Sequence, residues 1–561
     1  MIRTLVAAAL WLAIPASGAA FSPPAMPATA SSDTGRNVSL GIRRSAREPR
    51  AIGITPPRVT PRRRSPPSGR GEALLKGGIG SAPALTLPMV TGDGGGDGGG
   101  GDGAEGGRVT VAVIGGGIAG LTCADYLSRS GRVDPTVFDT GRLRPGGRCS
   151  SRLPGDRPKD RKASRDTILG SSVIDHAAQI LTVPAAAGFG RFRAQVERWE
   201  EEGVVRRYPL GSVCEILGNG DDGGGFSLRR IGQEENAMYY GVGGMNAIPA
   251  AILREGKENP GFRIEQDVWV SPSNGVRFVG GPSKPQWKIS CNGRQLGIFD
   301  RLIIAHNGKC ADRIMSRTPA KALHSLLRTN FAPTVPKSGG KRMTLNSIYS
   351  LTFVIKKEGS PLTRALGDDV ICGFIKNNAK LRFITCQSRK HHGSNGVAKD
   401  QVEIWTVLSS PQFAKKHKAP QENIPEDTKT EVIDLLLNSL TENLDLSGGG
   451  LSREGLLDSK LQLWGAAVPL NTWSSMNKNE ESSEPSSSGF LYDPENGVGA
   501  AGDWLLDPSI GGAWESGRRL AEWIIAEAES NDKGERSIGL PPNGAFRVSE
   551  ATAEAGIGNV K

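Results

Sequence analysis

The stretch from residue 109 to residue 120 constrains the fold of this 561-residue chain more than any other. A β-branched, apolar run ends at Ile114, and a helical pattern extends over residues 118–130. Between them, glycines stand at the spacing G-x-G-x-x-G, as Gly115, Gly117 and Gly120. A strand, a glycine turn and a helix in this order predict the first unit of a parallel α/β sheet that binds a dinucleotide.

Each glycine has a separate role in such a unit. Gly115 permits a tight turn, Gly117 lets the backbone approach a pyrophosphate, and Gly120 lets the helix pack against the strand. The first turn of the helix offers free N–H groups to the phosphates. A second strand at residues 135–138 ends at Asp139, where a carboxylate can accept the hydroxyls of an adenosine ribose. The alternative is a tight turn without a ligand.

The N-terminal segment has the features of a targeting leader. Residues 1–20 contain an early arginine, Arg3, and an apolar core too short for a membrane helix of ~20 residues, which indicates a signal peptide. No other long apolar run follows, so we expect no stable membrane insertion. Residues 21–107 are rich in Ser, Pro, Ala and Gly, and end in a glycine-rich linker. Their Arg-rich, acid-poor part is typical of a transit peptide, with a disordered basic linker as the alternative.

The junction Ala19-Ala20-Phe21 resembles the bipartite plastid-targeting leaders of algae with secondary plastids. This resemblance implies a location in the chloroplast stroma. The secreted pathway or an endomembrane lumen is the alternative.

The charge pattern argues against a nucleic-acid partner, and the spacing of Cys and His argues against a bound metal. Residues 36–70 hold ten Arg and one acid, and so contribute +9 of the formal +11. No aromatic side chains interleave with these arginines, so we expect no nucleic-acid partner. No cysteines have the spacing C-x-x-C, and the only adjacent histidines, His391 and His392, lie in a polar stretch where we expect them to be solvated. We therefore predict no metal site.

Three further motifs combine small residues with polar ones. Residues 145–148 read Pro-Gly-Gly-Arg, where the glycines allow a close approach and Arg148 suits a phosphate, unless this is a turn with a solvated arginine. Residues 173–180 form a short strand with Asp175, His176 and Gln179, which either satisfy the local backbone or place Gln179 over a cofactor. Residues 499–528 form a small-residue strand and a helix, arranged for a ligand or for close packing.

The other elements indicate a second domain inserted into the first. Residues 299–305 predict another buried parallel strand. Residues 321–484 mix strands with a helix at about residues 428–440.

Together the motifs resemble the flavin-dependent amine oxidase superfamily, and within it the renalase-like branch. The resemblance covers about residues 108–320 and 460–528. In chain order, the motifs that carry it are the glycine motif, Gly146-Gly147-Arg148, Asp175-His176-Ala177-Ala178-Gln179, Gly243-Gly244-Met245-Asn246, Gly502-Asp503-Trp504 and Ala513-Trp514-Glu515-Ser516-Gly517. Residues 305–310 and 461–467 resemble a plant chloroplast branch; bacterial relatives have a Pro-containing segment in place of the former.

The resemblance implies FAD as the cofactor and an α/β fold, in which a Rossmann-like FAD-binding domain of the amine-oxidase type is interleaved with an α+β substrate domain. The residues implied to bind FAD are Gly115, Gly117, Ile118, Ala119, Gly120, Asp139, Gly146, Gly147, Arg148, Val268, Gly502, Asp503, Ala513 and Trp514. Val268 would contact adenine through its backbone, and Ala513 and Trp514 would lie beneath the flavin ring. Gln179 and Trp464 are candidates for contact with the substrate.

These implications define domain bounds and a reaction. We expect a signal peptide (1–20), a transit peptide with linker (21–107), FAD-binding parts (108–190, 236–320, 485–530), substrate-domain parts (191–235, 321–484) and a disordered tail (531–561). The expected reaction is hydride transfer from a small molecule, an aberrant dihydronicotinamide or an amine, to flavin N5, with dioxygen or another acceptor reoxidising the flavin.

Three alternatives remain. One is a plastid carotenoid desaturase or protoporphyrinogen-oxidase-like flavoenzyme, and another is a non-catalytic FAD-binding sensor or assembly factor. An NAD-dependent dehydrogenase accounts for the glycine motif but leaves Gly502 and Asp503 unexplained.

Overall fold

The computed structural model describes the chain from Arg108 onward, with gaps. The described residues are 108–156, 167–184, 187–218, 225–232, 237–281, 284–392, 401–446, 450–475, 489–529, 544–548 and 559–560. The expected signal peptide, transit peptide and linker lie outside them, as does most of the tail.

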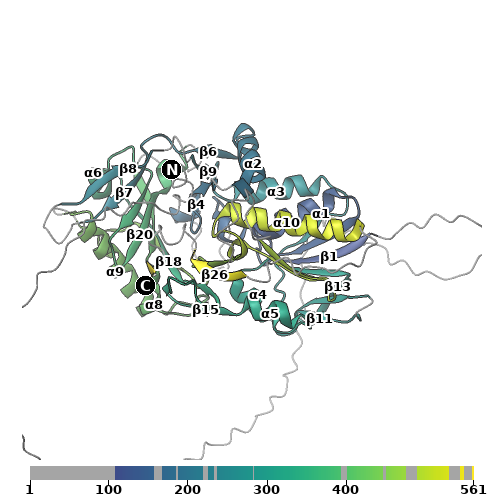
Figure 1. Ribbon diagram of the computed structural model, residues 1–561. Helices are drawn as coiled ribbons and strands as arrows, with labels where there is room; N and C mark the ends of the chain where they lie inside the picture. Colours follow the sequence, from purple (N-terminus) through teal and green to yellow (C-terminus); the bar gives the residue numbers. More distant parts are fainter. Residues whose placement is uncertain are drawn as a thin grey trace, which may run out of the picture. The chain divides into compact units, whose positions relative to one another are not determined.

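A six-stranded, mostly parallel sheet carries the glycine motif at the end of its β1 strand (Figure 1). The strands lie in the order β10-β2-β1-β14-β25-β24, and only β24 runs antiparallel to its neighbour. Their bounds are β1 (Val109–Ile114), β2 (Val133–Phe138), β10 (Arg263–Glu265), β14 (Arg301–Ile304), β24 (Phe490–Asp493) and β25 (Val498–Ala501). The β-branched residues of β1 suit a strand that is buried on both faces.

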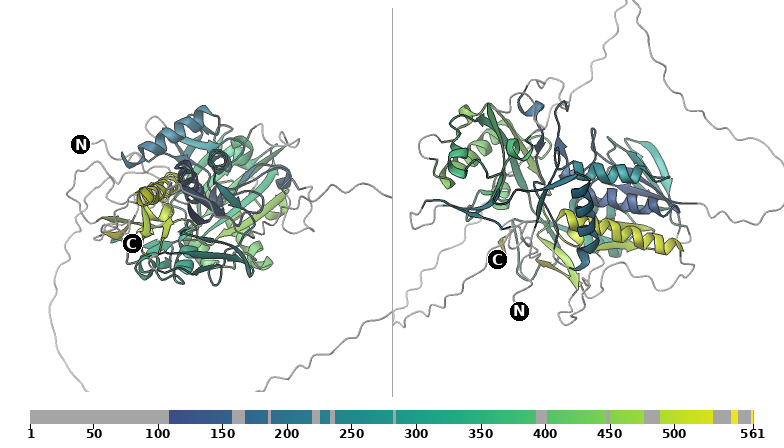
Figure 2. Two further views of the ribbon diagram at one scale, coloured as in Figure 1. Left: turned by 90° about the vertical axis from the view of Figure 1, so that its right-hand side faces the viewer. Right: turned by 90° about the horizontal axis from the view of Figure 1, so that it is seen from above.

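Alternate side chains of β1 enter two separate apolar cores. Val111 and Val113 pack in one core with three helices, α1 (Ile118–Arg129), α3 (Ala247–Lys257) and α10 (Ile510–Glu529). Ala112 and Ile114 pack in the other, with α4 (Gly308–Met315), α5 (Lys321–Leu327) and the small sheet of β11 (Val276–Phe278), β12 (Trp287–Cys291) and β13 (Arg294–Phe299). Helices α1 and α10 lie side by side (Figure 2). The result is the layered α/β arrangement of dinucleotide-binding domains.

A second sheet of seven strands is mostly antiparallel and has its own core. Its strands lie in the order β22-β18-β21-β20-β19-β7-β8. Their bounds are β7 (Val213–Leu217), β8 (Ser227–Arg230), β18 (Ile348–Lys356), β19 (Cys372–Lys376), β20 (Leu381–Cys386), β21 (Val402–Ser409) and β22 (Asp458–Trp464). Helix α9 (Glu426–Asn443) packs in this core. Because β7 and β8 precede the helix α3 of the first domain, the chain enters the second sheet twice.

Shorter elements connect and flank the two sheets. The strands are β3 (Ser151–Arg152), β4 (Ile174–Asp175), β5 (Leu181–Thr182), β6 (Val205–Arg207), β9 (Met238–Gly241), β15 (Thr329–Phe331), β16 (Thr334–Val335), β17 (Met343–Leu345), β23 (Asn471–Ser475), β26 (Gly544–Val548) and β27 (Asn559–Val560). The helices are α2 (Gly190–Glu201), α6 (Pro361–Leu366), α7 (Gln387–Lys390) and α8 (Pro411–Lys416). No helix in the described part of the chain is long and apolar enough to span a membrane.

The predicted α/β class with a Rossmann-like domain is confirmed. The strand predicted at 299–305 is β14, and the helix predicted at 428–440 is the longer α9. The predicted disorder of the tail is wrong for residues 544–548, which form β26. This strand pairs with β23, and Phe546 is buried against Trp473 with ring centroids 5.1 Å apart. Its pairing partner lies far away in sequence, so the local polarity of the tail did not reveal it.

Glycine is required where α1 meets its neighbours. A Cβ atom at Gly120 would overlap the carbonyl oxygen of Gly115, and one at Gly517 would overlap the carbonyl oxygen of Ala119. Gly115 itself has φ +117°, which L side chains rarely adopt. These positions bring α1 close to both β1 and α10.

We therefore expect Gly120→Ala to lower the free energy of unfolding by about 1–3 kcal/mol, because the added methyl group has no space. Urea unfolding followed by circular dichroism measures this change. Gly190→Ala is the matched control: Gly190 begins α2, and a Cβ there meets nothing within 4 Å. Equal destabilisation by both substitutions would contradict the packing role of Gly120.

Candidate dinucleotide site

A pocket opens where the parallel strands end, between the six-stranded sheet and residues of the second sheet. Its cavity is about 310 Å³, within the range of roughly 300–1,000 Å³ that is typical of ligand sites. Ligands of open α/β sheets bind outside the carboxyl ends of the strands, and the turns after β1, β2, β14 and β25 all contribute here.

The glycine turn forms the phosphate-binding part of this pocket. Gly117 is the N-cap of α1 with no capping side chain, and a Cβ on it would meet nothing within 4 Å. The Gly146 N–H donates to the Gly116 carbonyl over 2.8 Å, so residues 146–147 lie beside the turn. An uncapped helix N-terminus facing open space, with backbone on two sides, is suited to a pyrophosphate.

Asp139 follows β2 and is fixed by backbone donors. Its Oδ1 accepts from the Gly116 N–H over 3.0 Å, and its Oδ2 accepts from the Gly141 N–H over 2.9 Å. Burial raises the pKa of Asp139, and these two N–H groups partly oppose that shift. Each carboxylate oxygen has a second lone pair, so the side chain can also accept ribose hydroxyls.

Arg148 and Asp503 form a bidentate ion pair across the pocket, with N–O distances of 2.6 and 2.7 Å. Arg148 also donates to the Ala467 carbonyl over 2.8 Å. The pair therefore joins three segments that are distant in the sequence. Arg148 is half-buried and Asp503 is buried, a setting in which charge-assisted hydrogen bonds are strong.

Residues of the second sheet form the opposite wall of the pocket. Ile348, Leu408 and Trp464 line it together with residues 465–468. The Trp464 ring stacks on His176, with centroids 5.6 Å apart and an interplanar angle of 15°, and its Nε1–H donates to the His176 carbonyl over 3.0 Å. This wall is apolar and carries one rigid aromatic ring.

The structure brings most of the predicted site residues into this one pocket. Those that line it are Gly115, Gly117, Ile118, Ala119, Asp139, Gly146, Gly147, Arg148, Trp464, Gly502, Asp503 and Ala513.

Four predicted residues do not line the pocket. Gly120 packs against Gly115 instead. The Trp514 ring is buried against Tyr126 and Phe192, with centroids 5.7 and 5.6 Å away, because its side chain points into the helical core. The side chain of Val268 packs in the core on the other face of the sheet. Gln179 is buried in a polar cluster described below.

Sequence reasoning did not assign His306 and Asn307 to the site, although both line the pocket. They follow β14 directly, and the predicted strand at 299–305 already placed them at the ligand-binding edge of the sheet. Burial lowers the pKa of His306 to about 4, so its ring is neutral at pH 7. Asn307 caps α4 by accepting the Cys310 N–H over 3.2 Å.

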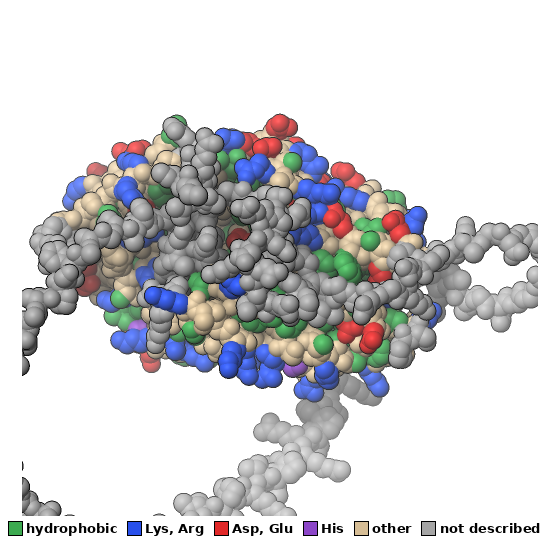
Figure 3. Space-filling model, in the orientation of Figure 1, with side chains coloured by type: hydrophobic (Ala, Val, Ile, Leu, Met, Phe, Trp, Pro, Cys, Tyr) green, Lys and Arg blue, Asp and Glu red, His purple; other side chains and the backbone are tan. Residues whose placement is uncertain are grey.

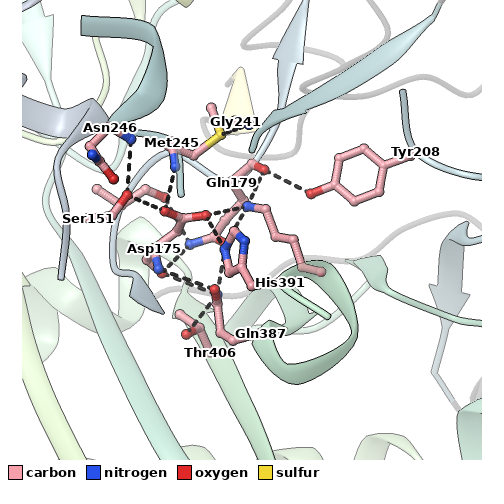
Figure 4. Close-up of polar contacts among 12 residues, drawn as sticks. Ser151, Asp175, Gln179, Tyr208, Gly241, Met245, Asn246, Gln387, His391 and Thr406 are labelled. Atoms are coloured by element: carbon pink, nitrogen blue, oxygen red, sulfur yellow. Dashed lines mark hydrogen bonds and ion pairs between the residues drawn. The ribbon is translucent and has the colours of Figure 1, made fainter. Parts of the chain in front are cut away.

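Asp175 is the centre of a fully buried polar cluster next to the pocket (Figure 4). Its Oδ1 accepts from Ser151 Oγ over 2.5 Å and from the Met245 N–H over 2.8 Å. Its Oδ2 lies 2.8 Å from Lys390 Nζ and 2.9 Å from His391 Nε2. One carboxylate thus connects the Rossmann-like domain to α7 of the second domain.

The prediction that His391 is solvated is therefore wrong: its side chain is completely buried. Although burial opposes ionisation, the charges of Lys390 and His391 hold the pKa of Asp175 well below its ordinary value. An ionised carboxylate only accepts hydrogen bonds, so Nε2 of His391 carries a proton. Nδ1 of His391 has no hydrogen-bond partner among the described residues. Lys390 also donates to the Gln179 carbonyl over 2.6 Å.

Gln179 and Gln387 complete this cluster. Gln179 Nε2 donates to the Asp175 carbonyl over 2.7 Å, and Gln387 Nε2 donates to Gln179 Oε1 over 3.0 Å. These contacts direct the Gln179 side chain away from the pocket. The residues on either side of Gln179, Ala178 and Ile180, do line the pocket, so the cluster supports one of its walls.

Comparison with known proteins supports the dinucleotide-binding interpretation. A family model described as an NAD(P)-binding Rossmann-like domain matches residues 113–187. This range begins in β1 and includes Asp139, Arg148 and Asp175. The first domain is therefore a dinucleotide-binding domain of the Rossmann type.

The solved structures to which this chain is similar include an oxidoreductase from Methanosarcina mazei, at 12% identity over 74% of this chain and 100% of that chain, with a TM-score of 0.47. Aklavinone-11 hydroxylase, solved as a ternary complex with FAD and aklavinone, is 14% identical over 75% of this chain and 63% of that chain, with a TM-score of 0.39. A p-nitrophenol 4-monooxygenase from Pseudomonas putida is 12% identical over 75% of this chain and 81% of that chain, also with a TM-score of 0.39.

We expect Asp175→Asn to lower the free energy of unfolding at pH 7 by about 3–5 kcal/mol, because it leaves the buried Lys390 ammonium without a counter-charge. The pKa of Asp175 is lower in the folded protein than in the unfolded chain, where it is ~3.9. Its carboxylate therefore stabilises the fold fully above pH ~3.9, and this stabilisation is lost as the pH falls below that value. The difference from wild type should therefore shrink in acid.

Urea unfolding at pH 7 and at about pH 2 tests this expectation, because the contribution of the ionised Asp175 carboxylate is lost only below its unfolded pKa. Ser151→Ala removes a neutral donor to the same carboxylate and should cost about 1.5–3 kcal/mol. The double substitution Asp175→Asn with Lys390→Met should recover part of the loss. A loss of similar size in Asp175→Asn and Ser151→Ala would contradict the charge-pairing account.

Proposed function

We propose that this protein is an FAD-dependent oxidoreductase that oxidises a small molecule. The observation that carries the proposal is that one pocket contains the glycine turn, the Arg148–Asp503 pair and the Trp464 wall. Asp139, the glycine turn and residues 502–513 all contribute to this pocket, and a dinucleotide would contact each of them, whereas a mononucleotide would leave part of them without a ligand. NAD alone does not explain why a segment almost 400 residues downstream of the glycine turn completes the pocket.

The residues that line the pocket fit FAD. Gly115, Gly117 and the first turn of α1 would hold the pyrophosphate, and Asp139 would hold the adenosine ribose. Asp503 and Ala513 would contact the ribityl and flavin end, and the start of α10 would face the ring. The chemistry that bound FAD would supply is that of an acceptor for a hydride from a substrate C–H bond. The protein would position the donor against Trp464 and exclude water through Ile348 and Leu408.

The charges that line the pocket favour a neutral donor. Among the described residues that line it, the only carboxylates are Asp139 and Asp503. Asp503 is paired with Arg148, and Asp139 lies at the opposite end from Trp464 in the proposed FAD orientation. An ammonium group would have no counter-charge near the aromatic wall. We therefore propose that the donor is an aberrant dihydronicotinamide, the substrate class of renalase-like enzymes, rather than an amine.

The remaining parts of the proposal concern the acceptor and the location. Dioxygen or another acceptor would remove the electrons. The leader of residues 1–107 supports import into a plastid, because its two parts have the compositions of a signal peptide and a transit peptide.

The purified protein should bind FAD, which flavin absorbance and a fluorescence titration can measure. Gly117→Val should weaken FAD binding at least tenfold, because the side chain would enter the space for the pyrophosphate. The same substitution should leave the unfolding midpoint of the FAD-free protein nearly unchanged, because no atom lies within 4 Å of that Cβ. FAD binding that is unaffected by Gly117→Val would overturn this placement of the cofactor.

Anaerobic mixing with donors tests the substrate class. Dihydronicotinamides reduced at ring positions 2 or 6 should bleach the flavin absorbance at least tenfold faster than benzylamine or a polyamine. Trp464→Leu should slow this bleaching at least tenfold, while FAD affinity changes less than threefold. Faster bleaching by the amines would exclude the proposed donor, even if FAD is bound.

A further inference from the structure

The surface of α4, α5 and the strands that follow them carries an unbalanced positive charge. Residues 309–342 contain eight Lys or Arg and a single acid, Asp312. Seven of the eight cations are exposed, namely Arg313, Arg317, Lys321, Arg328, Lys337, Lys341 and Arg342. In Figure 3, Lys and Arg gather along the lower edge of the molecule, where Figure 1 places α8, β15, α4 and α5.

The single acid in this stretch does not neutralise the surface. Asp312 accepts from His324 Nε2 over 2.9 Å and from Thr329 Oγ1 over 3.0 Å. Among the described residues, none of the seven exposed cations forms a salt bridge. Their charge is therefore available to a partner.

A second segment extends this basic surface. Three exposed lysines, Lys415, Lys416 and Lys418, stand at the end of α8 and just beyond it. Helix α8 contacts β18, the strand after β17, and β17 pairs with β15, which contacts α4. We define the basic surface as the exposed Lys and Arg of residues 309–342 together with these three lysines.

The basic surface adjoins the cofactor pocket at three places. His306 and Asn307 line the pocket and lead directly into α4. Gln421 also lines it and lies three residues after Lys418, which limits their Cα separation to roughly 11 Å. The third connection is Asn346, three residues after β17 begins: its N–H donates to the Val468 carbonyl over 3.1 Å, at the pocket wall.

One exposed aromatic ring lies within the basic surface. Phe331 is 41% exposed at the end of β15, and Lys309 Nζ lies 5.5 Å from its ring centroid. Exposed aromatic side chains are enriched at protein-binding surfaces, and surrounding charges attract a partner over a distance. The combination is typical of a protein-binding surface rather than of a surface that is only solvated.

We propose that the basic surface docks an acidic one-electron carrier protein, which accepts the electrons that substrate oxidation delivers to the flavin. The proposal rests on the proposed function and names its acceptor by class. Each substrate oxidised delivers one hydride, that is, two electrons and a proton. Two carrier molecules would each take one electron in turn, and the proton is released to solvent. A protein carrier is favoured over a nucleic acid or a membrane because the surface is next to a redox pocket and includes Phe331.

Plant plastocyanin, an acidic blue-copper protein, is the probe, and cytochrome c, a basic one-electron carrier, is its comparison. The FAD-loaded protein is reduced anaerobically with dithionite and mixed with either carrier at low salt. Plastocyanin should lose its blue colour at least tenfold faster than cytochrome c is reduced by the same protein. Raising the ionic strength to 0.5 M should remove most of this preference, because screening shortens electrostatic attraction to a few ångströms.

A charge-matched pair of variants tests the surface itself. The test variant combines Arg313→Gln on α4, Arg317→Gln between the two helices and Lys321→Gln at the start of α5. The control combines Arg193→Gln, Arg206→Gln and Lys257→Gln on α2, β6 and α3, which are exposed away from the lower edge of Figure 1 and remove the same three charges. The test variant should weaken low-salt plastocyanin binding and slow its reduction at least tenfold, whereas the control should change both less than threefold. Binding is measured by calorimetry with and without FAD.

The outcomes separate this proposal from the proposed function. Equal effects of the two variants, or no binding of plastocyanin to the FAD-loaded protein, would overturn the docking surface. It would also be overturned if the test variant lost binding to phosphatidylglycerol vesicles or DNA while keeping that to plastocyanin. If the protein binds no FAD but retains plastocyanin binding that the test variant loses, the docking surface stands and the proposed function fails.

Discussion

The buried carboxylate of Asp175 connects the parts of this protein that form its pocket. It accepts hydrogen bonds from β3 and from the turn before α3 on one side, and from Lys390 and His391 of the second domain on the other. A charge without water is stable only when such donors surround it. Together with the contacts from Arg148 to Ala467 and from Trp464 to His176, this side chain therefore sets the relative position of the two walls of the pocket, although none of its atoms lines the cavity. The adjacent residues 176–178 transmit that position to Trp464 and to the pocket wall.

The parts of the fold that could be predicted are those with a local signal. The glycine spacing and the β-branched run define β1 and α1, and short-range hydrophobic patterns locate β14 and α9. The meeting of Arg148 and Asp503 across 355 residues was expected only because a resemblance placed both motifs on one cofactor. Composition, spacing and periodicity do not show such a contact, since nothing near Arg148 in the sequence depends on Asp503.

The features that could not be predicted have their causes far away in the chain. His391 lies in a polar sequence, and only Asp175, 216 residues earlier, makes its burial favourable. Trp514 has the position of a ligand contact in its motif, but Tyr126 and Phe192 fill the space around its ring instead. The basic surface could not be predicted for a different reason. The arginines of residues 36–70 account for most of the net charge, so the net charge of the chain gives no sign of a second basic region within the folded part.

The interleaving of the two domains has a consequence for how the protein can form. β1 begins at Val109, whereas β25, its second neighbour in the sheet, begins only at Val498. The parallel sheet, and with it the dinucleotide pocket, cannot be completed until the chain as far as Ala501 has left the ribosome. Contacts between such distant segments form slowly, because a long loop must close before they stabilise anything. A nascent chain released early would hold the glycine turn but not the residues that close over its ligand.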